Sequence, residues 1–518
     1  MSLDNFFKPN SSVYFVGIKG TGVCALAELM HNSGLKCSGS DIPEEFYTDA
    51  ILKELNIPYH EDFDAAHITK DIDLVVYSAA YSSADGASET NPQLARAQEL
   101  GIPMLKYTDA LGAWSEKFDS TGVCGVHGKT TTTAICGVLM KAAQLPAQIL
   151  VGSAVIDFAG TRQGGGLKPR STLCLGDKYF IAETCEYRRH FLSFRPRRII
   201  LTAVESDHQD YFPTYESIRD AFVEYCRLLP AGGQLIYCAD DSGASEVARI
   251  VEKDNQGIEL IPYGFGAKDG YGITSYKVEK ERAVFSVSGF SGEFKLSIPG
   301  RHEALNAAAA LALTVSLARN EKGGGHSGEN VLSGQQLASI KTALENFKST
   351  KRRSEIIGEA GGILFMDDYG HHPTAIKTTL EGIKNFYPSR RLIVSFMSHT
   401  YTRTAALLDE FAACFNDADI VFFHKIYASA RENYKGGVDG KTLYDKAKSI
   451  REKDSKENFS VAGKRETYYI EEYDDAFGPL CETLKSADLF ITLGAGNNWP
   501  LGVRLFEHFS SMDRSKYG

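Results

Sequence analysis

The chain has 518 residues, of which 43% are hydrophobic and 24% are charged, a composition typical of a globular protein with several domains. The formal net charge of −10 argues against a general nucleic-acid-binding protein. Apolar runs are too short to span a membrane, and the N-terminus lacks the pattern of a signal peptide. The ten cysteines are scattered without a CxxC pair, so we expect a cytoplasmic protein with free thiols and no membrane or nucleic-acid partner.

Short apolar, β-branched runs alternate with longer helical patterns, which predicts an α/β fold with parallel sheets. The predicted strands lie at residues 12–16, 121–124, 179–182, 198–202, 362–366, 391–395, 419–423 and 488–492. A glycine loop follows each of the first two strands, which predicts two separate sheets, and the last four strands predict a third. We therefore predict three domains: an N-terminal Rossmann-like domain (1–114), a central P-loop ATPase-type domain (115–348) and a C-terminal Rossmann-like domain (349–518).

The first glycine loop contains Gly17, Gly20 and Gly22 in a GxGxxA pattern directly after a predicted strand. Asp41 follows at about the distance of an acid that binds a ribose, and Lys19 would place a cation beside a pyrophosphate. These features suit a nicotinamide cofactor and a uridine diphosphate equally well. The loop alone therefore leaves an oxidoreductase open.

The second glycine loop reads GVHGKTTTT from residue 125 and lies between a predicted strand and a predicted helix. Backbone N–H groups of such a loop bind phosphate, Lys129 would reach the β- and γ-phosphates of ATP, and Thr130 would ligate Mg²⁺. The full Walker pattern needs glycine at position 123, where this chain has Val123. The predicted ATP-binding residues of this loop are Gly125, His127, Gly128, Lys129, Thr130 and Thr131. A nicotinamide-dependent oxidoreductase has no need for this second loop.

Two further polar groups follow predicted strands of the central domain. Glu183 ends one strand, which places a carboxylate where α/β sheets bind ligands and predicts a ligand of Mg²⁺ near the γ-phosphate. The segment 207–210, which contains His208, follows the next strand.

Taken in order, these motifs resemble those of the Mur ligase family, and the resemblance extends over nearly the whole chain. The other motifs that carry it lie at residues 78–80, 91–92, 205–210, 299–307, 352–353, 367–374, 399–404 and 494–497. The resemblance implies an enzyme of peptidoglycan precursor synthesis that uses ATP and Mg²⁺. Such an enzyme would activate the carboxylate of UDP-N-acetylmuramate as an acyl phosphate and join it to L-alanine, as a monomer or homodimer.

The resemblance also implies roles for individual residues. The N-terminal domain would bind the UDP-sugar through the first glycine loop and Ser78. His208 would ligate a second Mg²⁺ that holds the substrate carboxylate. His302 and Asn306 would border the adenine, although Glu303 stands where the family more often has asparagine. The C-terminal residues implied in binding ATP, the amino acid or the transferred phosphate are Arg352, Asp368, His371, His372, His399 and Arg403. The segment before Pro373 also has the pattern of a helix cap.

One segment departs from the family pattern. Cys185, Arg188 and Arg189 stand where relatives usually have acidic or small residues. This departure indicates either altered substrate contacts or an impaired enzyme. The alternatives left open are a sister ligase that uses a preformed tripeptide, a nicotinamide-dependent oxidoreductase and a non-catalytic nucleotide-binding protein.

Overall fold

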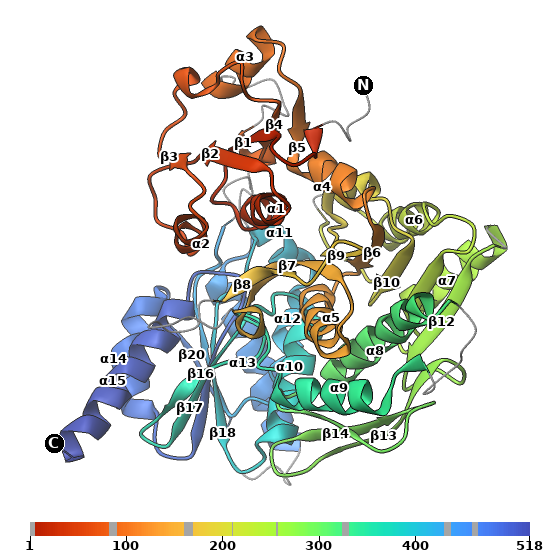
Figure 1. The fold of residues 1–518 in the computed structure, drawn as a ribbon. Helices are drawn as coiled ribbons and strands as arrows, with labels where there is room; N and C mark the ends of the chain where they lie inside the picture. The colour runs from red at the N-terminus through yellow and green to blue at the C-terminus, as the bar shows by residue number, and fades with distance from the viewer. Residues whose placement is uncertain are drawn as a thin grey trace.

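A computed structural model describes residues 6–81, 91–159, 169–209, 211–254, 257–323, 331–428, 437–457 and 465–517. Asp210 of the 205–210 motif lies outside these ranges. Within them, the chain forms three successive α/β units, each built around its own sheet (Figure 1). The predicted fold class, α/β with three domains, is confirmed.

The N-terminal unit is a parallel five-stranded sheet in the order β3-β2-β1-β4-β5. Its strands are β1 (Ser12–Val16), β2 (Lys36–Ser40), β3 (Tyr59–His60), β4 (Leu74–Tyr77) and β5 (Met104–Lys106). Its helices are α1 (Thr21–Asn32), α2 (Asp49–Glu54), α3 (Pro92–Glu99) and α4 (Tyr107–Ser115), with short 3₁₀ turns η2 (Ala65–His67) and η3 (Ala79–Tyr81). The first glycine loop connects β1 to α1, as the sequence predicts.

The central unit is a ten-stranded sheet in the order β15-β14-β13-β12-β11-β10-β6-β9-β7-β8. Its strands are β6 (Asp119–Cys124), β7 (Ala147–Val155), β8 (Arg170–Cys174), β9 (Tyr179–Glu183), β10 (Arg198–Leu201), β11 (Gln234–Cys238), β12 (Glu259–Gly264), β13 (Tyr271–Val278), β14 (Ala283–Val287) and β15 (Phe294–Leu296). Its helices are α5 (Lys129–Ala143), α6 (Tyr215–Cys226), α7 (Ser242–Asp254), α8 (Arg301–Glu321) and α9 (Gly334–Asn346), with 3₁₀ turns η4 (Ile156–Phe158) and η5 (Tyr187–Ser193). β13 is parallel to β12, whereas β14 is antiparallel to both β13 and β15 at one edge, and β8 is antiparallel to β7 at the other. The prediction of parallel sheets did not include these antiparallel pairs.

Helices cover both faces of the central sheet because its inner strands alternate apolar residues between two cores. Ile200 belongs to the core formed with α5, α8 and α9, whereas Ile199 and Leu201 belong to the core formed with α6 and α7. Three neighbouring parallel strands, β10, β6 and β9, end at the same edge of the sheet. Their carboxyl ends therefore bring the second glycine loop, Glu183 and the segment before His208 together.

The C-terminal unit is a six-stranded sheet in the order β16-β17-β21-β18-β19-β20. Its strands are β16 (Glu355–Ala360), β17 (Ile363–Asp368), β18 (Arg391–Phe396), β19 (Ile420–Phe423), β20 (Glu466–Tyr469) and β21 (Asp488–Leu493). Its helices are α10 (Pro373–Phe386), α11 (Tyr401–Ala406), α12 (Leu408–Ala413), α13 (Gly440–Glu457), α14 (Phe477–Thr483) and α15 (Trp499–Tyr517), with a 3₁₀ turn η7 (Tyr473–Ala476). The strand β16 is antiparallel to β17, and the other pairs are parallel.

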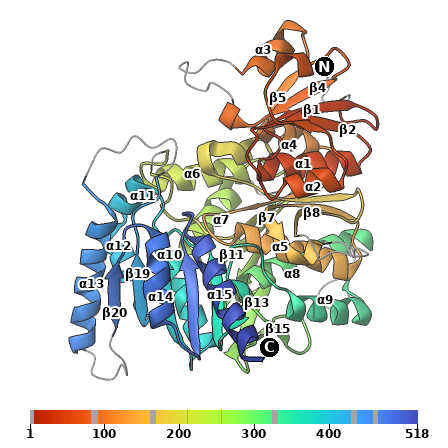
Figure 2. The same cartoon turned by 90° about the vertical axis from the view of Figure 1, so that its left-hand side faces the viewer.

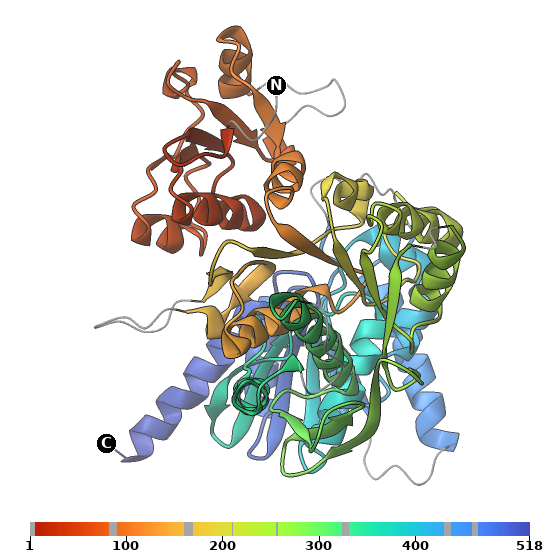
Figure 3. The same ribbon diagram turned by 45° about the vertical axis from the view of Figure 1, so that its right-hand side comes forward.

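The N-terminal unit lies at one end of the central unit, and the C-terminal unit packs against the side of the central unit (Figures 2 and 3). One apolar cluster continues from the central helices α5 and α8 into α10 of the C-terminal unit. We propose that the domain boundaries lie at 114/115 and 348/349, as predicted, because each sheet is confined to one of the three ranges. Among the described residues, the helices are too short or too polar to cross a bilayer.

Candidate active site

The second glycine loop is shaped by Gly128, which precedes α5 with a φ of 77°. This is the left-handed region, which residues with a Cβ rarely adopt. A Cβ at this position would lie 2.8 Å from Oδ1 of Asn306, and that oxygen also accepts a hydrogen bond of 3.0 Å from Thr132 Oγ1. The loop can therefore approach the start of α8 only with glycine at position 128.

We expect Gly128→Ala to destabilise the protein by about 1–2 kcal/mol, the cost of a left-handed non-glycine residue. Repulsion from Asn306 adds to this cost. Gly334→Ala is the matched control because Gly334 also begins a helix, and a Cβ there would have open space. Urea unfolding of both variants checks the prediction. Equal unfolding midpoints for the two would contradict the account of Gly128.

Lys129 begins α5, and its ammonium lies 3.0 and 3.2 Å from the two carboxylate oxygens of Glu186. Burial lowers the pKa of Lys129, but the Glu186 carboxylate raises it more, so the pKa lies above its usual value. Oε1 of Glu186 also lies 3.4 Å from Nε2 of His208. An ammonium, a carboxylate and an imidazole thus meet beside the glycine loop, in an arrangement that can hold a phosphate and a divalent cation.

Thr130 and Glu183 form a second polar pair at the same edge of the sheet. Thr130 Oγ1 donates to Oε1 of Glu183 at 3.0 Å, and the backbone N–H of Gly152 donates to Oε2 at 2.8 Å. A hydroxyl and a carboxylate oxygen this close together are the donors that Mg²⁺ prefers. The pair therefore fits the predicted Mg²⁺ ligands, whereas Glu186 and His208 offer a mixed oxygen and nitrogen set.

A buried ion pair connects the central and C-terminal units. The guanidinium of Arg403 in α11 lies 2.9 Å from Oδ1 of Asp207, and both side chains are at least nine-tenths buried. Although burial raises the pKa of Asp207, Arg403 and two histidines lower it more, so its pKa lies well below the usual value. Burial and the charge of Arg403 lower the pKa of His371, which keeps this imidazole neutral.

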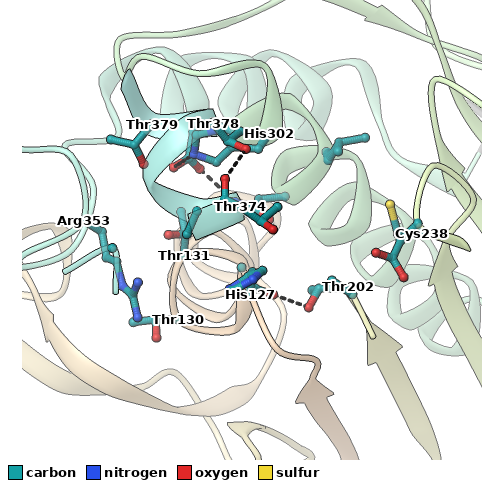
Figure 4. Close-up of a pocket in the computed structure, with 18 of the residues that line it drawn as sticks. His127, Thr130, Thr131, Thr202, Cys238, His302, Arg353, Thr374, Thr378 and Thr379 are labelled. Carbon is teal, nitrogen blue, oxygen red and sulfur yellow. Dashed lines mark hydrogen bonds and ion pairs between the residues drawn. The ribbon is translucent and has the colours of Figure 1, made fainter. Parts of the chain in front are cut away.

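A cavity of about 410 Å³ lies between the glycine loop, α8 and α10, and its lining includes His127, His302 and Thr374 (Figure 4). Its lining includes the predicted residues His127, Gly128, Thr130, Thr131, His302, Asn306 and Asp368. Burial lowers the pKa of His302, but Glu303, 3.3 Å away, raises it more, so the pKa lies above its usual value. The size of the cavity, and a lining that combines apolar side chains with several polar groups, suit a nucleotide.

Arg353 lines the cavity, whereas its predicted neighbour Arg352 is held elsewhere. The guanidinium of Arg352 lies 3.0 Å from Asp367 and donates to the carbonyl of Gly494 at 2.7 Å. These contacts connect β17 to the loop after β21. Burial raises the pKa of Asp367 to about 6 despite this partner.

Lys19, predicted beside a pyrophosphate, is fully buried among oxygen atoms. Its ammonium lies 2.9 Å from Glu61, 3.1 Å from Asp49 and 3.0 Å from the carbonyl of Ile42. Its backbone N–H donates to Asp41 at 2.7 Å. The side chain of Lys19 thus stabilises the first glycine loop through these buried contacts, on the side of residues 42–61.

Two tyrosines pack against the first glycine loop. Tyr81 donates to Asp41 at 2.8 Å, and its ring would lie 2.7 Å from a Cβ at position 17. The hydroxyl of Tyr107 would lie 2.7 Å from a Cβ at position 22. Gly17 and Gly22 are therefore required for packing, in addition to any role toward a ligand.

The remaining predicted residues lie near these groups. His399 stacks on Tyr427 with ring centroids 5.8 Å apart, and its carbonyl accepts a bond from Arg403 at 3.4 Å. His372 is the N-cap of α10, so the alternative of a helix cap before Pro373 is confirmed. Ser78 accepts a hydrogen bond of 3.3 Å from the N–H of Ala80 in η3.

Four polar residues of the site were missing from the predicted set: Glu186, Glu205, Asp207 and Arg353. Glu186 comes three residues after Glu183, but it lies in an irregular segment without a periodic pattern to predict its direction. Asp207 neighbours the predicted His208, and its distant partner Arg403 gives no local signal.

The departing segment 184–189 has an unusual backbone. Arg188 and Arg189 have φ values of 51° and 60° in η5, and Arg189 forms an ion pair with Glu224 on α6. The guanidinium of Arg188 lies 5.8 Å from the ring centre of Tyr187. Cys185 is an exposed free thiol. The arginines therefore lie on the surface beside the site, whereas the buried carboxylate of Glu186 is present.

Comparison with known families gives matches over most of the chain. Residues 12–119 match the Mur ligase family catalytic domain, residues 123–314 the Mur ligase middle domain, and residues 352–496 the Mur ligase glutamate ligase domain. The chain is 46% identical over 497 residues to a UDP-N-acetylmuramate–L-alanine ligase of Treponema pallidum (strain Nichols), covering 96% of each. It is 37% identical over 501 residues to the ligase of the same name from Borrelia garinii, covering 96% of this chain and 98% of that one.

Solved structures of two ligases are similar to this chain over nearly its whole length. A UDP-N-acetylmuramate–alanine ligase from Thermotoga maritima is 25% identical with a TM-score of 0.68, covering 97% of this chain and 99% of that one. A murein peptide ligase from Psychrobacter arcticus, 22% identical over 97% of this chain and 99% of that one with a TM-score of 0.60, shares the fold. The chain belongs to the Mur ligase family.

Proposed function

We propose that the chain joins L-alanine to the lactyl carboxylate of UDP-N-acetylmuramate in peptidoglycan precursor synthesis. ATP would be converted to ADP and phosphate through an acyl-phosphate intermediate. The observation that carries the proposal is the cluster of Lys129, Glu186 and His208 at the glycine loop, beside the Asp207–Arg403 pair. The names of relatives at 46% and 37% identity support L-alanine as the acceptor.

In the first step, a carboxylate oxygen of the substrate attacks the γ-phosphorus, and ADP leaves. Lys129 and the backbone N–H groups at the start of α5 stabilise the charge on the transferred phosphoryl group. Thr130 and Glu183, and Glu186 and His208, would hold Mg²⁺, which when bound would neutralise phosphate and carboxylate charge. The protein supplies positioning and electrostatic stabilisation.

In the second step, the amine of L-alanine attacks the acyl carbonyl, phosphate leaves, and the amine loses a proton. Arg403 would hold a carboxylate or the departing phosphate. His371, which is held neutral beside it, can accept the proton. Because an acyl phosphate hydrolyses in water, the contact between the central and C-terminal units would also exclude solvent.

We also propose a role for the N-terminal unit, a cellular compartment and an oligomeric state. This unit would bind the UDP-sugar at the first glycine loop, with Gly20 and Ser78 nearest the ligand. The enzyme would act as a monomer or homodimer in the cytoplasm, and the free cysteines of the described residues support a reducing compartment. The tripeptide ligase, oxidoreductase and non-catalytic alternatives are not favoured by the named relatives.

The proposal is tested by measuring phosphate release from ATP and Mg²⁺ with UDP-N-acetylmuramate and one of three acceptors: L-alanine, the tripeptide or none. We expect release only with L-alanine. Release only with the tripeptide would reassign the chain to the recycling activity. No release with any acceptor, in protein that still binds the uridine nucleotide, would favour a non-catalytic role.

A further inference from the structure

His127, Glu205 and His372 form a polar cluster where the C-terminal unit meets the glycine loop. His127 lies in the loop after β6, Glu205 follows β10, and His372 caps α10. One donor atom from each residue lies within 4.8 Å of the other two. In the ranges that the structure describes, these three residues are the group of His, Cys, Asp or Glu side chains whose potential ligand atoms lie close enough together to share a metal ion. None of these residues belongs to the pairs that fit Mg²⁺.

Both imidazoles approach the same carboxylate oxygen. Nε2 of His127 contacts Oε1 of Glu205, and Nδ1 of His372 lies 3.8 Å from that oxygen. The other oxygen of Glu205 accepts a hydrogen bond of 3.0 Å from Thr374. The distance between His372 and Glu205 is too long for a hydrogen bond, so these groups face each other without a direct bond.

His372 is 5% exposed, and within the described part of the chain its Nε2 atom has no hydrogen-bond partner. Burial lowers the pKa of His372, and the nearby His127 lowers it further. The ring is therefore neutral, the form in which an imidazole ligates a metal. The backbone N–H of Thr374 is 3.4 Å from Nδ1, a long contact that leaves the lone pair weakly used.

We propose that His127, Glu205 and His372 form a binding site for a transition-metal ion of the Zn²⁺ class, separate from the Mg²⁺ ligands. Two imidazoles and one carboxylate are a common set for such ions, whereas Mg²⁺ prefers oxygen. Donor atoms around tetrahedral zinc are about 3.4 Å apart. Side-chain rotations that move the donor atoms by about 1 Å would therefore complete the site. The fourth position would face the nucleotide cavity, which His127 and Glu205 line.

The metal would connect two units of the protein beside the nucleotide cavity. His127 and Glu205 belong to the central unit, and His372 belongs to the C-terminal unit. A shared ion would therefore hold the two units together and occupy space beside the phosphates. We expect micromolar Zn²⁺ to inhibit turnover in the presence of excess Mg²⁺.

The test measures binding of Co²⁺, a spectroscopic probe for Zn²⁺ sites, to the full chain without nucleotide. We expect one equivalent to bind with visible d–d bands of a tetrahedral nitrogen–oxygen site, and Zn²⁺ but not Mg²⁺ to displace it. His372→Ala and Glu205→Gln should each weaken this binding by at least about 100-fold, since even outer-shell partners of a metal cost up to that much. The Glu205→Gln variant retains the shape of the side chain, so it guards against a folding defect.

The matched control is His67→Ala in the N-terminal unit. His60 and His67 stack with ring centroids 3.5 Å apart and offer a second imidazole pair, within the described ranges, that a metal could bind. Bands that persist in His67→Ala and disappear in both cluster variants support the proposal. Bands that disappear in His67→Ala, or that remain in His372→Ala, would overturn it.

Discussion

Lys129→Ala is expected to lower the rate of ATP-dependent ligation by about 10²–10³-fold, the usual loss when one group that stabilises transition-state charge is removed. Lys129 is the first residue of α5 and lies beside the glycine loop. Its ammonium remains charged because Glu186 raises its pKa. No other lysine or arginine of the described chain forms an ion pair with Glu186. The loss should therefore appear mainly in kcat, measured as phosphate release with L-alanine.

Lys141→Ala is the control for this prediction. Lys141 lies in the last turn of the same helix, is exposed, and is far along α5 from the glycine loop. We expect its kcat and KM to equal those of the unmodified protein. Circular dichroism should show that both variants fold. A Lys129→Ala enzyme with at least half of the normal kcat would contradict the assigned role.

The sequence was sufficient to predict the elements that carry the chemistry. Val123, Ile181 and Ile200 lie in apolar, β-branched runs, and the structure confirms each run as a buried inner strand. Because parallel strands end at one edge, the positions of the second glycine loop and Glu183 followed from the same pattern. The edge strands β13–β15 were not predicted because β13 and β15 contain polar or charged residues such as Ser275, Lys277 and Lys295, and β14 is a short run without a flanking motif.

Long-range pairs are what the sequence could not provide. Lys19 looked like a partner for pyrophosphate, but Asp49 and Glu61, far along the chain, surround it. Likewise, the positions of Asp207 and Arg403 differ by 196 in the sequence, and their contact depends on how two units pack. Local patterns determine strands and loops, whereas the partner of a buried charge depends on tertiary packing.

Arg403→Ala is the second prediction with a large expected effect. Removing the guanidinium leaves the buried carboxylate of Asp207 without its partner, which costs about 3–5 kcal/mol for such pairs. Asp207→Asn combined with Arg403→Ala should recover part of this loss because no unpaired charge remains. Lys425→Ala, which breaks the exposed pair with Glu472, should change stability by less than about 1 kcal/mol. Urea unfolding at pH 7 measures all three.

The same pair predicts how stability depends on pH. The pKa of Asp207 in the folded protein lies well below its usual value, so the pair stabilises the protein above the unfolded pKa of about 4. As the pH falls below that value, the unfolded carboxylate gains a proton first, and the stabilisation is progressively lost. Between pH 7 and pH 3 the unmodified protein should therefore lose more stability than the Asp207→Asn, Arg403→Ala double variant. Equal losses in the two proteins would mean that the Asp207–Arg403 pair does not hold the central and C-terminal units together.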